Sequence, residues 1–247
     1  MNSTRTLVGV HRRAQTGHSS SESSEHKTSN VSLINSARNV NKNALTWRWY
    51  LMTIAAFIVA GWTFHFIYHQ PPGMDGYVEI RNRILGNPLG FAHVFGGGTA
   101  MALGPFQFLR SLRSQGKTSA RFSTHSWVGR IYTLAVLASG VGSIDIVKKS
   151  DLYTFGAVGF IMLGLSWVVT GTLGWVAMWK DKPDVDSHRK WMIRNFALTY
   201  AAVMLRWQFP LMIILGTEVK LALSWSGWCC WVPNLIFVDY WVLRTQK

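Results

Sequence analysis

Charged residues and cysteines are both scarce in this sequence. Only 15% of the residues are charged, against roughly 25% in typical soluble domains, whereas 49% are hydrophobic. The two cysteines, Cys229 and Cys230, are adjacent, which is neither a disulfide framework nor a zinc-binding spacing. The composition argues against a soluble protein, and we expect both cysteines to be small apolar fillers within a helix.

Aromatic residues are absent from the first 46 residues, which are rich in Ser, Asn and Thr. Such a segment cannot bury enough apolar surface to offset the entropy lost on ordering. We therefore predict a disordered polar tail over residues 1–46, on the cytosolic side. Residues 47–247, which contain all 13 Trp of the chain, form the second predicted domain.

Long apolar runs dominate this second domain. A hydrocarbon core of about 30 Å needs roughly 20 helical residues, and backbone polar groups within lipid must be satisfied inside the segment. The fold class we predict is all-α, a polytopic transmembrane bundle of about six helices with a disordered N-terminal tail. The predicted spans are 47–68, 89–109, 127–146, 152–179, 191–215 and 219–243. Pro233 and Asn234 interrupt the last span, and the loop 70–88 is long enough for a short helix.

Basic residues exceed acidic ones, which gives a formal net charge of +14. They lie in short clusters between the apolar runs and form no single face or stripe, so we expect no nucleic-acid partner. The loops at 110–121 and 180–190 carry most of them, together with the two termini. The positive-inside rule then predicts a multi-pass protein of the lipid bilayer with both termini cytosolic, in a membrane that the sequence leaves open.

Ionisable side chains inside the membrane are costly, so each calls for a partner or a function. His125 and His188 begin the third and fifth spans on the same predicted side. Arg130 and Arg194 follow about one and a half turns deeper. Asp239, near the same end of the sixth span, is the expected counter-ion for one of the two arginines.

The opposite side of the predicted bundle carries three more histidines. His93 lies in the second span, and His65 and His69 share one face at the end of the first. Arg206 lies in the outer half of the fifth span, where it could meet Glu218 or an anionic ligand.

Paired neutral imidazoles on facing helices are a common way for a bundle to hold haem iron, and arginines commonly receive the propionates. We therefore predict a haem b site. Its expected residues are His125 and His188 as the iron ligands, Arg130 and Arg194 at the propionates, and His93 with His65 or His69 as a second pair. Histidines and arginines at helix ends also cap, snorkel or bind lipid phosphate, and that interpretation stays open. Gly96–Gly98 and Gly171/Gly174 are expected to permit close helix packing.

Several ordered motifs resemble a family of predicted membrane proteins, domain of unknown function 2306. The motifs are His93-Val-Phe-Gly-Gly, Leu103-Gly-Pro-Phe-Gln-Phe-Leu-Arg110, His125-Ser-Trp-Val-Gly-Arg130-Ile-Tyr, His188-Arg-Lys-Trp-Met-Ile-Arg194 and Trp231-Val-Pro-Asn-Leu235. The resemblance covers about residues 50 to 243. It implies a multi-pass membrane fold and supplies no activity.

The stretch from Phe122 to Gly129 is also similar to the haem-ligand segment of cytochrome b561, in which a His-Ser-Trp-apolar-Gly stretch starts a core helix. This resemblance implies transmembrane electron transfer through bis-histidine haems. That family places ligand histidines on four consecutive core helices, whereas the span 152–179 has none here. A second haem would therefore need His65 or His69.

Three classes of function follow from these observations. The first is a haem-binding, cytochrome-b-like membrane oxidoreductase or electron carrier with a redox partner. The second is a non-haem membrane enzyme that acts on a small lipophilic, lipid-like substrate through His and Asp. The third is a transporter or a structural membrane protein, although no internal repeat is visible.

Overall fold

The structure is a computed structural model that describes residues 47–69, 75–109, 112, 123–179 and 181–244. The predicted disordered tail, 1–46, lies outside these residues. Within them every regular element is a helix, which confirms the all-α prediction. The chain divides into two units, Met1–Leu51 and Met52–Lys247, and the second is described below.

Five helical spans are long and apolar enough to cross a membrane, which confirms the multi-pass transmembrane fold. Their bounds are Trp47–Tyr68 (the first helix), Thr124–Lys149 (α4), Thr154–Ala177 (α5), Val185–Ile214 and Val219–Leu243. The span Val185–Ile214 consists of two helices, α6 (Val185–Thr199) and α7 (Ala201–Ile214). They coincide with five of the six predicted segments to within three residues, except that the fifth begins six residues earlier, at Val185 and not at 191.

The predicted segment 89–109 is built from two shorter pieces. Helix α3 covers Pro88–Leu103, and the 3-10 helix η1 covers Gly104–Phe108. At their usual rises these pieces are about 24 Å and 10 Å long, so neither alone spans a hydrocarbon core of about 30 Å, and the segment is not among the five spans. Helix α2, Asp75–Leu85, is the short helix expected in the preceding loop.

The last span is interrupted, as its proline predicts. Helix α8 covers Val219–Cys229, α9 covers Val232–Phe237, and a π-helix, η4, covers Val238–Leu243. Pro233 lies in the first turn of α9, where a missing backbone N–H is tolerated. The Asn234 carboxamide donates to Ala197 O at 3.2 Å and so ties α9 to α6. Both cysteines are free thiols, and Cys230 is buried.

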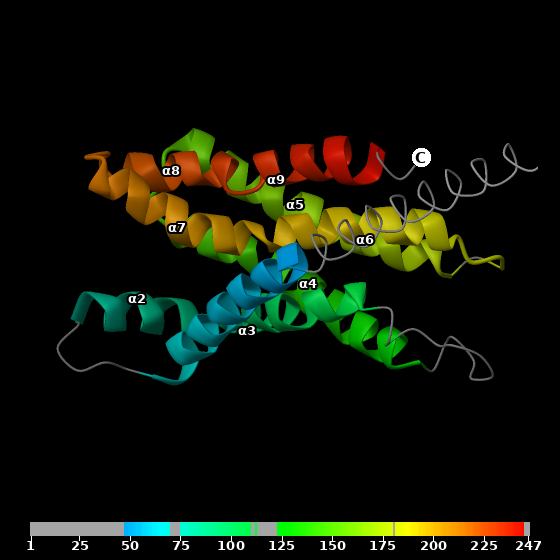
Figure 1. The fold of residues 1–247 in the computed structure, drawn as a ribbon. Helices are drawn as coiled ribbons and strands as arrows, with labels where there is room; N and C mark the ends of the chain where they lie inside the picture. Colours follow the sequence, from blue (N-terminus) through cyan, green and yellow to red (C-terminus); the bar gives the residue numbers. More distant parts are fainter. Residues whose placement is uncertain (1–46, 70–74, 110–111, 113–122, 180, 245–247) are drawn as a thin grey trace, which may run out of the picture. The chain divides into compact units, whose positions relative to one another are not determined.

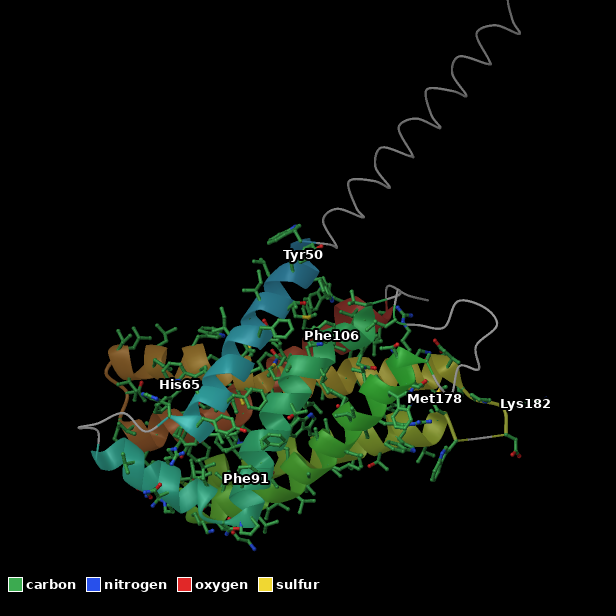
Figure 2. All side chains as sticks on the ribbon, turned by 90° about the horizontal axis from the view of Figure 1, so that it is seen from below. Tyr50, His65, Phe91, Phe106, Met178 and Lys182 are labelled. Carbon is green, nitrogen blue, oxygen red and sulfur yellow. The ribbon has the colours of Figure 1, made fainter. Side chains whose placement is uncertain are left out.

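Consecutive helices pack against one another in the order α3, α4, α5 and α6, while α8 packs on α5 and α7 (Figure 1). Short connections reverse the chain between α4 and α5 and between α5 and α6; Met178 and Lys182, labelled in Figure 2, lie in the second of these. Helices α4 and α6 therefore begin at the same end of the unit, on the right in Figure 1. We name it the His125 end, and the opposite end the Tyr68 end.

Glycines line the contacts between neighbouring helices. A Cβ on Gly96 would lie 2.7 Å from the carbonyl O of Ala135 on α4. A Cβ on Gly171 would lie 3.3 Å from Val136 and 3.2 Å from Asn195, so α5 is held between α4 and α6 at this glycine. These approaches confirm the close packing predicted for the glycines. Association within lipid relies on such van der Waals contact.

Candidate functional site

A buried polar cluster joins α4, α5 and α6 at the centre of the unit. The Tyr132 hydroxyl donates to Asn195 Oδ1 at 2.7 Å and lies 2.8 Å from Thr199 Oγ1. Asn195 Nδ2 donates to Trp167 O at 2.7 Å and to Thr170 Oγ1 at 2.8 Å, and Trp167 Nε1 donates to Thr199 Oγ1. Because Tyr132 and Asn195 are fully buried, these bonds fix the position and register of the three helices.

His125 and His188 occupy matching positions near the starts of two parallel helices. Helices α4 and α6 run in the same direction because each packs antiparallel to α5. Tyr132 and Asn195 follow the two histidines by seven residues each (125 to 132 and 188 to 195). Seven residues are about two helical turns, so His125 lies on the same face of α4 as Tyr132, and His188 on the same face of α6 as Asn195. Each histidine is about 10 Å nearer the His125 end than that residue.

A second pair of residues gives a register of α4 and α6 that differs from the first by about one helical turn. Val136 and Asn195 lie on either side of Gly171, as described above. Counting seven residues back from Val136 and Asn195 leads to Gly129 and His188. His188 is therefore level with the first turn of α4, from His125 to Gly129.

The imidazole of His188 is held in one orientation by α5. Its Nδ1 lies 2.8 Å from the carbonyl O of Gly174. A carbonyl only accepts hydrogen bonds, so Nδ1 carries a proton, and in the neutral imidazole Nε2 keeps its lone pair. A histidine that ligates a metal through Nε2 uses this tautomer, and a backbone carbonyl is a usual partner for the other nitrogen.

Arg130 and Arg194 each lie over a tryptophan three residues earlier in the chain. The guanidinium carbon of Arg130 is 4.7 Å from the centroid of the Trp127 ring, and that of Arg194 is 5.0 Å from that of Trp191. Arg194 Nε also donates to Asp239 Oδ1 at 2.8 Å. This ion pair confirms Asp239 as the counter-ion of one predicted arginine, so Arg194 is already neutralised by a carboxylate.

Gln107, on η1, is absent from the predicted site residues but lies against the first turn of α4. A Cβ on Gly129 would be 3.3 Å from Gln107 Oε1, so the carboxamide rests directly on that glycine. Gln107 Nε2 is buried and makes no hydrogen bond among the described residues. A buried amide without a partner is uncommon and requires an explanation.

His93, at the Tyr68 end, is directed at α4. Its Nδ1 lies 2.9 Å from the carbonyl O of Ser139, and the Ser139 hydroxyl donates to His93 O at 2.8 Å. The proton of His93 is thus also on Nδ1, and Nε2 again keeps its lone pair. Of the predicted histidines, His93 and His188 share this arrangement.

His65 and His69 stack on each other, with ring centroids 4.5 Å apart. Both are exposed on the first helix, whereas Thr63 and Ile67 of that helix are buried. Figure 2 labels His65 on this helix. The structure thus brings His65 and His69 together, while the described bonds of His93 run to α4.

A cleft of about 350 Å³ opens at the Tyr68 end, away from His125 and His188. Its charged residues come from α2, α4, α8 and the turn after α4, and are Arg83, Asp145, Lys149, Asp151, Glu218 and Lys220. Most are already paired: Lys149 lies 2.8 Å from Asp145, and Lys220 lies 2.7 Å from Asp151.

The comparisons with known proteins agree with the helical membrane fold. The model of a family described as "Predicted membrane protein (DUF2306)" matches residues 90–242, which is more than half of the 247-residue chain. The matched region contains the buried polar cluster, His93, His125 and His188. No curated protein and no solved structure gives a significant match.

Proposed function

This chain belongs to the family of predicted membrane proteins DUF2306, and from that premise we propose that it is a haem-binding electron carrier of the membrane. His125 and His188 would hold the haem iron. The observation that carries the proposal is the bond between His188 Nδ1 and the carbonyl O of Gly174, at 2.8 Å. It places a proton on Nδ1, so that in the neutral imidazole Nε2 is the nitrogen that could bind a metal.

The number of donors also suits haem. Within the described residues no group of three or more His, Cys, Asp or Glu side chains could hold a metal ion. A zinc ion needs three or four such ligands, whereas a haem iron needs fewer from the protein because the porphyrin supplies nitrogens of its own. The two histidines would be the protein's share. A bound haem would supply one-electron transfer.

The surroundings of the two histidines support the same proposal. Arg130 and Arg194 would face the propionates. Arg194 also pairs with Asp239, at 2.8 Å.

A second haem at the Tyr68 end is a weaker part of the proposal, and it would use His93. The bond between His93 Nδ1 and Ser139 O leaves Nε2 with its lone pair, as in His188. Its partner would be His65 or His69. Neither has a described contact with His93, so the proposal depends on the His125 end.

An absorption spectrum of the purified protein, from cells supplied with haem, tests this proposal. We expect Soret and α bands that shift on reduction, and that are lost in His125→Ala and His188→Ala. His11→Ala is the control, because His11 lies outside residues 47–247 and belongs to neither proposed haem site, and it should keep the bands. His188→Met should retain haem with an altered spectrum and a higher reduction potential, since methionine is also an axial ligand.

A colourless preparation of the folded wild-type protein would refute the proposal. So would a His188→Met protein whose spectrum and potential match the wild type, because a residue with a purely structural role does not tune the iron. The two alternative functions, a non-haem enzyme and a transporter, gain no specific support from the described residues.

A further inference from the structure

Arg206 is an exposed cation within a membrane span. It lies on α7, in the span Val185–Ile214, and its side chain is exposed at the surface of the protein. In a span this surface faces lipid. An arginine in that position is costly unless its charge finds a partner.

The protein satisfies only part of the Arg206 guanidinium. Nη1 donates to Ala202 O at 2.9 Å, one turn back on the same helix, and Nη2 donates to Thr63 Oγ1 at 3.1 Å on the first helix. Both acceptors are neutral. The ion pairs among the described residues do not include Arg206, so its charge is not balanced by a carboxylate there.

Glu218, the acid that the sequence suggested for Arg206, has another role. Its Oε1 accepts from the backbone N–H of Lys220 and its Oε2 from that of Leu221, which caps the start of α8. Because Glu218 caps α8, the partner that remains for Arg206, of the two that the sequence suggested, is an anionic ligand.

The depth of Arg206 identifies the kind of anion. Thr63, which it touches, lies five residues before the end of the first helix at Tyr68, or about 8 Å. Trp62 and Trp207, the chain neighbours of these two residues, are 62% and 51% exposed. Exposed tryptophans near the end of a span mark the level of lipid headgroups, where the available anion is a phosphate.

We propose that Arg206, anchored by Thr63, binds the phosphate of an anionic phospholipid in the leaflet at the Tyr68 end. The two bonds to Ala202 and Thr63 hold the guanidinium against the protein and leave its other N–H groups for the phosphate oxygens. Arginine suits this task because its planar fork matches phosphate oxygens. This site is separate from His125 and His188, so the proposal is independent of haem.

Lipid retention by the full chain tests the proposal. The protein is incorporated into nanodiscs of phosphatidylcholine with a minority of phosphatidylglycerol, released into mild detergent and examined by native mass spectrometry. We expect retained phosphatidylglycerol in the wild type and about fivefold weaker retention in Arg206→Gln, the loss expected for one interfacial cation. Arg206→Lys should fall between the two, because it keeps the charge and loses the fork.

Arg83→Gln is the matched control, since it removes the same charge at the same end but from α2, outside the spans. It should retain lipid like the wild type. Equal retention by Arg206→Gln and wild type would overturn the proposal, as would an equal loss in Arg83→Gln. Displacement of the lipid by excess inorganic phosphate would also overturn it, by showing a site for free anions. Thermal unfolding in the same detergent checks that Arg206→Gln is folded.

Discussion

Tyr132→Phe removes one hydroxyl from the buried polar cluster and leaves the volume of the side chain almost unchanged. In the wild type this hydroxyl donates to Asn195 Oδ1 at 2.7 Å and lies 2.8 Å from Thr199 Oγ1. The substitution leaves Asn195 Oδ1 buried without its donor. Interhelical hydrogen bonds in membranes contribute from about 0.6 to about 1.7 kcal/mol each, so we expect a loss of about 1–2 kcal/mol.

For a chain of this length that loss corresponds to a fall in Tm of about 2–8 °C. The measurement is thermal unfolding in detergent, at a fixed heating rate because membrane proteins often unfold irreversibly. Tyr68→Phe is the control: Tyr68 is 77% exposed, and the substitution should leave Tm unchanged.

A double-mutant cycle separates the hydrogen bond from packing. With Asn195→Leu already present the acceptor is gone, so adding Tyr132→Phe should lower Tm by less than half as much as it does alone. An unchanged Tm in Tyr132→Phe would refute the view that this cluster holds α4 to α6. Additive losses in the double variant would refute the specific pairing of Tyr132 with Asn195.

Two further predictions concern the contacts of α5 and α6. Gly159→Ala would place a Cβ 2.7 Å from the backbone O of Gly227, so α5 and α8 must separate; we expect a loss of about 1–3 kcal/mol, measured as Tm. Gly61→Ala, with open space at the Cβ, should be neutral, and equal losses in both variants would contradict the prediction. Asp239→Asn should cost less than about 1 kcal/mol, because the ion pair with Arg194 is partly exposed. A fall in Tm above about 5 °C would contradict this, since it implies a desolvated pair.

Sequence patterns predict the positions of the five membrane spans. Apolar length predicts the first helix and the last span to the residue, and Pro233 predicts the interruption in the last span. The pairing of Asp239 with an arginine also follows from sequence, because both lie at one depth where a charge needs a partner. One predicted span differs: Gly104 and Pro105 turn the last residues of the segment 89–109 into a 3-10 helix.

The polar cluster and the role of Arg206 could not be predicted in the same way. Tyr132 ends one of the motifs and Asn195 directly follows another, so both stand beside predicted residues. Their bond nevertheless joins positions 63 residues apart. The bond from Arg206 to Thr63 spans 143 residues. Gln107 lies within one of the motifs, but nothing near it in the sequence indicates that its carboxamide rests on Gly129.

The sequence by itself determined that the chain is a multi-pass helical membrane protein, where five of its apolar spans lie, and which ionisable side chains share a depth. The tertiary structure decided which faces of those helices meet. The reason is the solvent: in lipid both faces of a helix are apolar, so hydrophobic periodicity does not reveal the packed face. Close contact at glycines and a few buried hydrogen bonds make that choice, and they exist only once helices distant in sequence lie side by side.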